Sequence, residues 1–475
     1  MTSLAVLAAD LGASSGKIAR VSFDGNRILA EEERGIANRP AQIFQHSYWS
    51  VFSLYTDMLS AFAELSTPEV RSVGIDTWGA SFGLIGKNGM LTEPIYHYRD
   101  VRTKTALEEI YQSVTAREIF WETGCQPNRN YSLAHLFVTA RHAPEQMNRA
   151  EQLLFLPDLF NYFLSGERCS ELSFAGTSAL LNASLDGWNR GLLQRLDIPT
   201  HILGKLVPPG SIRGHVLPGV SAQSNLPTAA KVISACSHDT AAAVSAIPDF
   251  NENAVYVGCG TNINMGIRSE APIITEDAYR SGLKNTGAMF GRNLLYKDFN
   301  AFWLLNRLRQ EWQLQNKQYS FSELFDLARQ HMHEARLLDV EDECFNNTSE
   351  SISQLLRHSL LGSEEPLTEE NDGRLLASIF YSIAYKICDT IRSLEQASGR
   401  QIQKIYIING GARNTLLNQL VADMSGKPVY AGLFNASLLG NSLSQLYALG
   451  YIASEEEMNA VCRRSFQLDL YLPQA

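Results

Sequence analysis

Apolar runs and glycine-rich breaks follow one another at the start of the chain. Residues 4–10 form an apolar run, and further runs at 17–23 and 27–33 are separated by Asp24-Gly25. Runs of this length bounded by turn residues predict β-strands, and Asp-Gly between two of them is typical of a hairpin turn. The chain therefore opens with three predicted strands joined by tight turns.

The same plan recurs later in the chain. The stretch "VRSVGIDTWGASFGLIG" reads as strand, loop and strand with a polar break at Asp76-Thr77, and "AVYVGCGTNINMGIR" from Ala254 repeats it. Helical patterns fill 104–118 and 132–164. One apolar face of a long helix is formed by Leu376, Ile379, Ile383, Ile387, Ile391 and Leu394, and the strand "KIYIING" follows it.

Both halves thus begin with strand–turn units and end in helices. Because 475 residues are too many for one ordinary core, two similar α/β domains are expected, with a cleft between them. The pattern breaks near Ala246–Asn253, so we predict domains at 1–247 and 248–475. The acidic stretch 338–370 is predicted to be a solvated insertion.

Composition narrows the class of protein. Hydrophobic content of 45% and charged content of 19% are typical of a globular protein. A net charge of -10 argues against nucleic acid or an anionic membrane as the main partner. The seven cysteines form no C-x-x-C pair, and no apolar run reaches membrane-spanning length, so we expect a cytoplasmic protein with reduced thiols.

Three glycine turns are candidates for binding phosphate. They lie at Gly12–Gly16, Gly258–Asn262 and Asn409–Asn414. None fits the P-loop or dinucleotide fingerprint, since Gly12 and Gly16 are too close and Ile263 replaces the third glycine. Glycine still lets backbone N–H groups approach phosphate oxygens, and each turn alone is also compatible with a plain bend. Three together indicate a nucleotide site, and Asp10 at a strand end beside one of them is a candidate Mg²⁺ ligand.

A second carboxylate, Asp239, lies in "SACSHDTAAAV" before an alanine-rich helix. It is either an N-cap or a general base. Phosphoryl transfer needs a base for the acceptor hydroxyl, a metal ion and positioned donors, and an aspartate is ionised at neutral pH. His238 is better suited to donate a hydrogen bond to substrate than to act as the base.

The ordered set of motifs resembles the FGGY carbohydrate kinases, which have two actin/hexokinase-like (ribonuclease H-like) domains flanking an active-site cleft. The matching stretches are "DLGASSGK", "GIDTWG", "YRDVRT", "SHDTAAAV", "NGGARNTLLNQL" and "ASLLGN", and they run almost end to end. Within that family the chain is most similar to the rhamnulokinases. The resemblance implies transfer of the γ-phosphate of Mg-ATP to O1 of an L-ketohexose, most simply L-rhamnulose.

The resemblance also implies roles for single residues. It assigns Asp239 as the proton acceptor and Asp10 to the metal ion. It assigns ATP contacts to Ala13, Ser14, Ser15, Gly16, Lys17, Gly260, Thr261, Asn306 and Gly411. It assigns sugar contacts to Gly79, Tyr98, His238, Asp239, Thr240 and Asp298, and Trp78 beside Gly79 is a further candidate for contact with sugar.

Some positions leave alternatives open. Trp78 is equally compatible with stacking on sugar and with packing under a loop. Asp298 and Asn306 depart from the amide and glutamine typical of rhamnulokinases, so L-fuculose, L-xylulose or another deoxyketose stays open as the substrate. Asp298 is also compatible with capping a helix that begins near Phe299. A non-catalytic ATP-binding sensor or scaffold of the same fold is the alternative outside the enzymes, and the two retained aspartates argue against it.

Overall fold

The structure is a computed structural model of the chain, and it describes residues 4–260, 262–346, 350–360 and 369–474. The chain forms two compact units. The first comprises Met1–Phe250, Arg268–Leu295 and Asn435–Phe466, and the second comprises Asn251–Ile267, Tyr296–Phe434 and Gln467–Ala475. The predicted division at 247/248 places a single cut in the chain, whereas each unit collects three separate segments.

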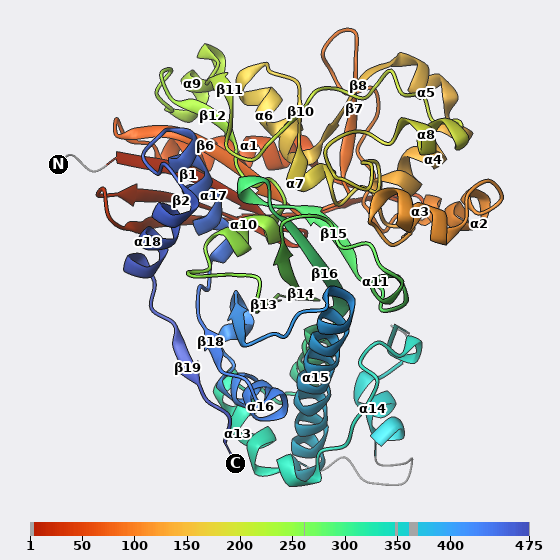
Figure 1. Cartoon of the computed structure of the whole chain (residues 1–475), viewed down its shortest axis with the longest axis vertical. Helices are drawn as coiled ribbons and strands as arrows, with labels where there is room; N and C mark the ends of the chain where they lie inside the picture. The colour runs from red at the N-terminus through yellow and green to blue at the C-terminus, as the bar shows by residue number, and fades with distance from the viewer. Residues whose placement is uncertain (1–3, 261, 347–349, 361–368, 475) are drawn as a thin grey trace. The chain divides into compact units, whose positions relative to one another are not determined.

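The first unit is built on a six-stranded sheet of order β11-β12-β6-β1-β2-β3 (Figure 1). β1, β6 and β12 run parallel and carry almost entirely buried residues, whereas β2 and β3 continue from β1 as antiparallel neighbours. This confirms the three predicted opening strands. The strands are β1 Leu4–Leu11, β2 Ser15–Phe23, β3 Ile28–Ala37, β6 Val70–Thr77, β11 Ser211–His215 and β12 Lys231–Ser234.

A helix from late in the chain completes the core of this unit. α17, Ala436–Ala448, packs on β1, β6 and α10, Asp239–Ser245 (Figure 1). A Cβ atom on Gly440 would lie 1.7 Å from the backbone oxygen of Ala242, so only glycine permits this approach of the two helices. The other helices that contact the sheet or flank it are α1 Val51–Leu65, α6 Leu156–Ser165 and α9 Pro218–Ser224.

A second apolar cluster of the first unit lies around the antiparallel pair β7, Phe82–Gly86, and β8, Ala150–Phe155. The predicted helical run 132–164 is wrong in its middle, because β8 interrupts it to pair with β7. Proline begins or nearly begins each helix beside this strand, which fits its favourable place in a first turn. The elements here are α2 Ala106–Ile110, α3 Ala116–Thr123, α4 Ser132–His142, α5 Pro144–Arg149, β9 Ser170–Glu171, α7 Leu172–Ala175, α8 Arg190–Arg195 and β10 Leu206–Val207.

Ion pairs join the three segments of the first unit. Glu455, at the start of α18, Glu455–Ser465, pairs with Arg268 and, at 3.5 Å, with Arg292. Arg268 also donates to the backbone oxygen of Phe250 at 3.3 Å.

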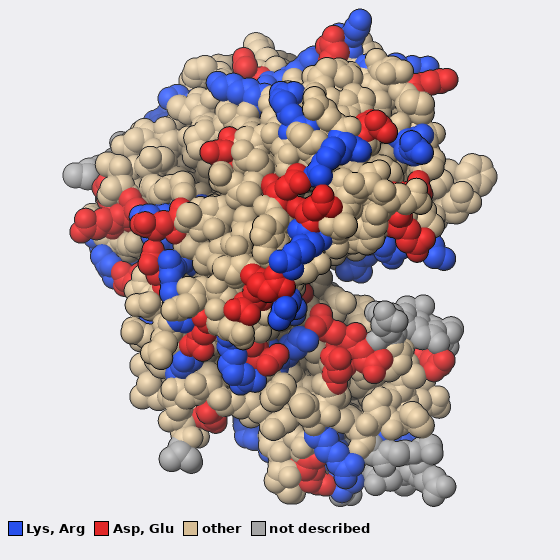
Figure 2. Space-filling model, turned by 45° about the vertical axis from the view of Figure 1, so that its right-hand side comes forward, with Lys and Arg blue, Asp and Glu red and all other residues tan. Residues whose placement is uncertain are grey.

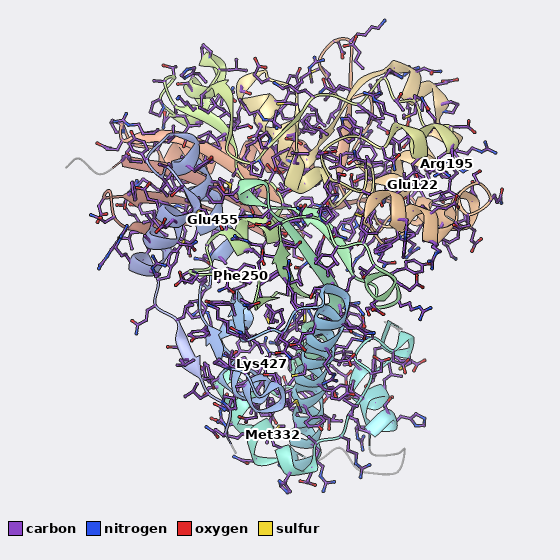
Figure 3. All side chains as sticks on the ribbon, in the orientation of Figure 1. Glu122, Arg195, Phe250, Met332, Lys427 and Glu455 are labelled. Atoms are coloured by element: carbon purple, nitrogen blue, oxygen red, sulfur yellow. The ribbon has the colours of Figure 1, made fainter. Side chains whose placement is uncertain are left out.

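Figure 3 labels Phe250 and Glu455, and it also labels Glu122 and Arg195, which form an ion pair between α3 and α8. Smaller elements of this unit are β4 Ala41–Ile43, β5 His46–Tyr48, α11 Glu276–Arg280 and β15 Lys284–Gly287.

The second unit contains parallel strands β13 and β17, with β14 antiparallel to β13, and β18 and β19 beyond β17. The long helix α15, Glu369–Ser398, buries the predicted apolar face. The elements are β13 Ala254–Cys259, β14 Asn262–Ser269, β16 Asn293–Asn300, α12 Phe302–Leu314, α13 Phe321–Gln330, α14 Ile352–Leu360, β17 Lys404–Ile408, α16 Thr415–Ser425, β18 Val429–Ala431 and β19 Asp469–Tyr471.

The stretch 338–370 does not behave as the predicted solvated insertion where the structure describes it. Leu338, Phe345 and Leu356 are buried, and the backbone N–H of Leu338 donates to Ser382 of α15 at 2.9 Å. The apolar residues among the acidic ones therefore anchor this segment to the long helix. Residues 361–368 lie outside the described part.

Charge is mixed over the surface. On the face drawn in Figure 2, acidic and basic side chains lie among one another. Arg34 and Glu64 form one exposed ion pair, with 2.6 Å between Nε and Oε2. No helix in the described ranges has both the length and the apolar character required to cross a bilayer.

Candidate active site

Two aspartates face each other at the carboxyl end of the first sheet. Asp10 on β1 is paired in register with Asp76 on β6. Burial, and to a smaller extent the negative charge of Asp239, raise the pKa of Asp10 to about 7, although a hydrogen bond with Asp76 acts to lower it. Burial and the Asp10 charge raise the pKa of fully buried Asp76 well above its usual range. Of the two, Asp76 therefore holds a proton more strongly, and the hydrogen bond between them favours the negative form of Asp10 at the strand end.

The turn after β1 is tight and presents exposed hydroxyls. Gly12 N–H donates to Ser15 O at 3.0 Å, and a Cβ on Gly12 would lie 2.6 Å from that oxygen. Ser14 and Ser15 are exposed. Lys17 donates to Asn435 at 3.1 Å and pairs with Glu33 at 3.2 Å. The glycine thus closes a hairpin that leaves Ser14 and Ser15 open to a ligand.

Asp239 is the first residue of α10 and is not its N-cap. His238 occupies the cap position, and its side chain makes no capping hydrogen bond. Asp239 Oδ1 accepts from the backbone N–H and hydroxyl of Thr240 at 2.5 and 3.2 Å, and His238 Nε2 lies 3.4 Å away. With its side chain 35% exposed, Asp239 remains accessible. The capping alternative is therefore wrong for this residue.

Gly79, His238 and Thr177 lie together beside Asp239. A Cβ on Gly79 would lie 3.4 Å from Thr177 Oγ1 and 3.5 Å from His238 Nε2. Gly79 therefore leaves a small space between two polar groups. Sequence reasoning missed Thr177, whose only local signal is its place in the "AGTSALLN" stretch.

The aromatic residues predicted to contact sugar differ in accessibility. Trp78 is 5% exposed, its ring centroid is 4.2 Å from that of Trp49, and its indole N–H donates to Ser81 at 2.9 Å. Tyr98 is half-buried, stacks on His97 with the ring centroids 4.6 Å apart, and lines a small pocket that is open to solvent. Of the two rings, Tyr98 is thus the one that faces open space.

His135 and Arg102 form the wall of this pocket behind Tyr98. His135 donates from Nε2 to the Tyr98 backbone oxygen at 3.0 Å, and Arg102 donates to the His135 oxygen at 2.9 Å. Burial and the charge of Arg102 lower the pKa of His135 to about 4. His135 is therefore neutral at pH 7 and structural, and Arg102 is packed against it.

In the second unit, two predicted nucleotide turns come together. Gly258 and Ile408 are partners on parallel β13 and β17, so the turns that follow these strands lie at one edge. A Cβ on Gly411 would lie 2.1 Å from Cys259 Cβ, and Gly260 N–H donates to Asn262 O at 3.0 Å. Thr261, assigned to the same turn, lies outside the described residues.

Asp298 and Asn306 occupy different elements of the second unit. Asp298 lies on β16, is exposed, and accepts a hydrogen bond from Asn264. The capping alternative for Asp298 is wrong, because α12 begins at Phe302 with Ala301 as its N-cap. Asn306 is half-buried on α12.

Sequence comparison identifies the family. A family model described as the N-terminal domain of the FGGY family of carbohydrate kinases matches residues 5–245, and that of the C-terminal domain matches residues 255–449. The chain belongs to the FGGY family of carbohydrate kinases. It is an ATP-dependent sugar kinase, and enzymes of this family use ATP with a divalent metal ion.

Full-length relatives of this FGGY kinase include curated rhamnulokinases. The chain is 32% identical to the rhamnulokinase of Bacteroides thetaiotaomicron, over 98% of this chain and 95% of that protein. It is 29% identical to the rhamnulokinase of Bacillus subtilis, with the same coverage of both chains.

Solved structures show the fold. A gluconate kinase from Lactobacillus acidophilus has a TM-score of 0.83 at 14% identity, covering 100% of this chain and 94% of that one. Plasmodium falciparum glycerol kinase with ADP has a TM-score of 0.81 at 14% identity, covering 99% and 94%. These likenesses confirm the predicted α/β class with two actin/hexokinase-like domains.

The donor set of this FGGY kinase fits a metal ion held mainly by nucleotide and water. Across the described ranges, no three His, Cys, Asp or Glu side chains form a site that could hold an ion alone. A hard divalent cation commonly binds one or two carboxylates together with substrate phosphates and water. Asp10 presents such a carboxylate, and a cation there would relieve the repulsion from Asp239 that raises its pKa.

Proposed function

We propose that this FGGY kinase transfers the γ-phosphoryl group of Mg-ATP to O1 of L-rhamnulose. The accessible carboxylate of Asp239 beside Gly79 and His238 carries the proposal, because it combines a base with a small polar space. The substrate itself is inferred from the full-length rhamnulokinase relatives.

Asp239 accepts the proton of the sugar hydroxyl as that oxygen attacks phosphorus. The hydrogen bonds from Thr240 fix the orientation of this carboxylate. His238, Gly79 and Tyr98 contact the sugar, and Thr177 adds a hydroxyl at the same place. Trp78 packs beneath these sugar-contacting residues, since it is almost wholly buried.

In this proposal the three glycine turns bind ATP. The turn Ala13–Lys17 donates backbone N–H groups and hydroxyls to phosphate, and Gly260, Thr261, Asn306 and Gly411 contact the nucleotide. Asp10 holds Mg²⁺, which when bound neutralises charge on the phosphate oxygens. A hydrogen bond with Asp76 keeps Asp10 in place, and Asn441 in turn donates to Asp76.

An ADP-release assay over a panel of sugars tests the substrate. The panel contains L-rhamnulose, L-fuculose, L-ribulose, L-xylulose, D-xylulose and glycerol. We expect the highest kcat/KM with L-rhamnulose. A higher value with another sugar would reassign the substrate, and ATP binding without turnover of any sugar would support a sensor or scaffold instead.

A further inference from the structure

Glu171 is a fully buried carboxylate that the proposed chemistry does not use. Four donors surround it. Its Oε1 accepts from Ser173 N–H at 2.6 Å, and its Oε2 accepts from Ser173 Oγ at 2.6 Å, from Phe174 N–H at 3.1 Å and from Ser237 N–H at 3.1 Å. The last of these bonds reaches from α7 to the segment that carries Asp239.

Ser173 extends this contact by one residue. The backbone N–H of His238 donates to Ser173 Oγ at 3.4 Å, while that hydroxyl donates to Glu171. Two consecutive buried N–H groups, those of Ser237 and His238, are therefore satisfied by Glu171 and Ser173. Both groups precede α10, so no intrahelical acceptor is available to them.

The opposite side of the same segment is fixed by the sheet. Thr77 N–H donates to Ser237 O at 2.9 Å, and Thr77 and His238 form an isolated parallel bridge. The backbone leading into Asp239 is thus held between β6 and the Glu171–Ser173 pair. Because Asp239 begins α10, this backbone sets the direction in which its side chain leaves the helix.

The need to cap the N-terminus of α7 does not explain why residue 171 is a glutamate. α7 has only four residues, and its cap requires the Ser173 and Phe174 N–H groups. A serine or aspartate serves as a cap without burying a long carboxylate, which is costly. Only a side chain with the reach and two oxygens of glutamate accepts from α7 and from Ser237 at once.

The backbone of Glu171 is itself held in place by a buried carboxylate. Glu171 N–H donates to both oxygens of Asp158 at 3.2 Å, and Asp158 pairs with Arg213 at 2.5 Å. Asp158 and Arg213 are both buried. The anchor for the Asp239 segment is therefore continuous with a buried ion pair in the interior of the first unit.

We propose that Glu171, acting through Ser173 and the Ser237–His238 backbone, is a positioning residue for Asp239. This inference rests on the proposed role of Asp239 as base. A misplacement of about 1 Å in a reacting group costs on the order of 100-fold in rate. Loss of the contacts from Glu171 and Ser173 to the Ser237–His238 backbone therefore lowers kcat without weakening the binding of ATP.

The test compares Glu171→Gln and Ser173→Ala with Thr286→Val in the full chain. Thr286 Oγ1 donates to the Ser173 backbone oxygen at 2.8 Å, so its loss weakens α7 but leaves the Ser237 and His238 contacts in place. For each variant we measure kcat, the KM for sugar, the Kd for an ATP analogue and the melting temperature.

We expect Glu171→Gln and Ser173→Ala to lower kcat by roughly 10–100-fold with the Kd for the ATP analogue unchanged. Thr286→Val should lower the melting temperature and keep the parent kcat. If Glu171→Gln fails to fold, Ser173→Ala carries the test, since it removes a single hydroxyl.

Two results overturn the inference. One is a parent-like kcat in Ser173→Ala and in any folded Glu171→Gln. The other is a loss of kcat in all three variants that follows the melting temperature. Asp239→Asn in the same assay distinguishes the two proposals. If it retains the parent kcat, the proposed base fails as well. If it is inactive while Ser173→Ala and any folded Glu171→Gln are fully active, only the positioning role is removed.

Discussion

Asn441 on α17 donates a hydrogen bond of 2.7 Å to the carboxyl group of Asp76 on β6. Its own amide oxygen accepts from Gln445 at 2.8 Å, and Gln445 also donates to Leu7 O at 3.0 Å. All of these groups are buried. A late helix thus supplies the polar partners of the strand ends on which the candidate site is built.

Replacing Asn441 by alanine should destabilise the first unit. The change leaves a buried oxygen of Asp76 without its donor, which costs about 2 kcal/mol of unfolding free energy. Urea denaturation measures the effect. Ser442→Ala on the same helix is the control, because the Ser442 hydroxyl donates to Leu438 O of its own helix at 2.9 Å. Equal losses for the two variants would contradict the role given to the Asp76 contact.

Asp239→Asn should lower kcat by roughly 10²–10⁴-fold, since the amide keeps the shape and cannot accept the proton. ATP should still bind, which isothermal calorimetry checks. Asp389→Asn, at an exposed site on α15, should behave as the parent. More than half of the parent kcat in Asp239→Asn would exclude this residue as the base.

Gly411→Ala should weaken ATP binding at least about 10-fold, because the new Cβ would overlap Cys259 and force the turn to move. Gly410→Ala in the same turn is a matched comparison, since its Cβ would meet nothing closer than 3.8 Å. Fluorescence titration with an ATP analogue measures both. An equal Kd in the two variants would show that the close approach of Gly411 to Cys259 does not shape the nucleotide site.

Acid should destabilise the protein partly through His135. Its pKa of about 4 in the folded state lies below the ordinary value of 6.5, so the unfolded chain binds more protons between these values. The free energy of unfolding therefore falls as the pH drops through this window, by at most about 1.4 kcal/mol per pH unit.

His135→Gln should lose less unfolding free energy than the parent between pH 7.5 and 5, because the variant has no group to titrate there. Urea denaturation at several pH values gives this difference. The exposed His142→Gln on the same helix serves as the control and should follow the parent. Parallel plots of unfolding free energy against pH for the parent and His135→Gln would contradict the lowered pKa of His135.

Local patterns were enough to predict the opening strands, the long helix α15 and the positions of the glycine turns, because each depends on neighbouring residues. The β8 strand escaped prediction, since its pairing with β7 overrides a sequence that also suits a helix. The residues that contact Asp76 and the Asp239 segment were not predicted for another reason. Asn441, Thr177 and Glu171 reach the site through tertiary contacts that no sequence period records.

Residue roles inferred from resemblance remain predictions, and the structure limits how they can act. The indole of Trp78 is occupied by Trp49 and Ser81, so direct stacking on sugar would require rearrangement. The exposed Asp298 bonds to Asn264 rather than to a helix end. In both cases the residue type was visible in the sequence, whereas its surroundings were not.

The close approach of Gly440 to Ala242 has a consequence for biosynthesis. Ribosomes make residues 251–434 after the sheet of the first unit and before α17, so a nascent first unit lacks one face of its core during that interval. Multidomain chains commonly fold from the amino-terminal domain onward as they emerge. Here the first-made unit is completed late, and its apolar strands β1 and β6 stay without the cover of α17 until that helix is synthesised.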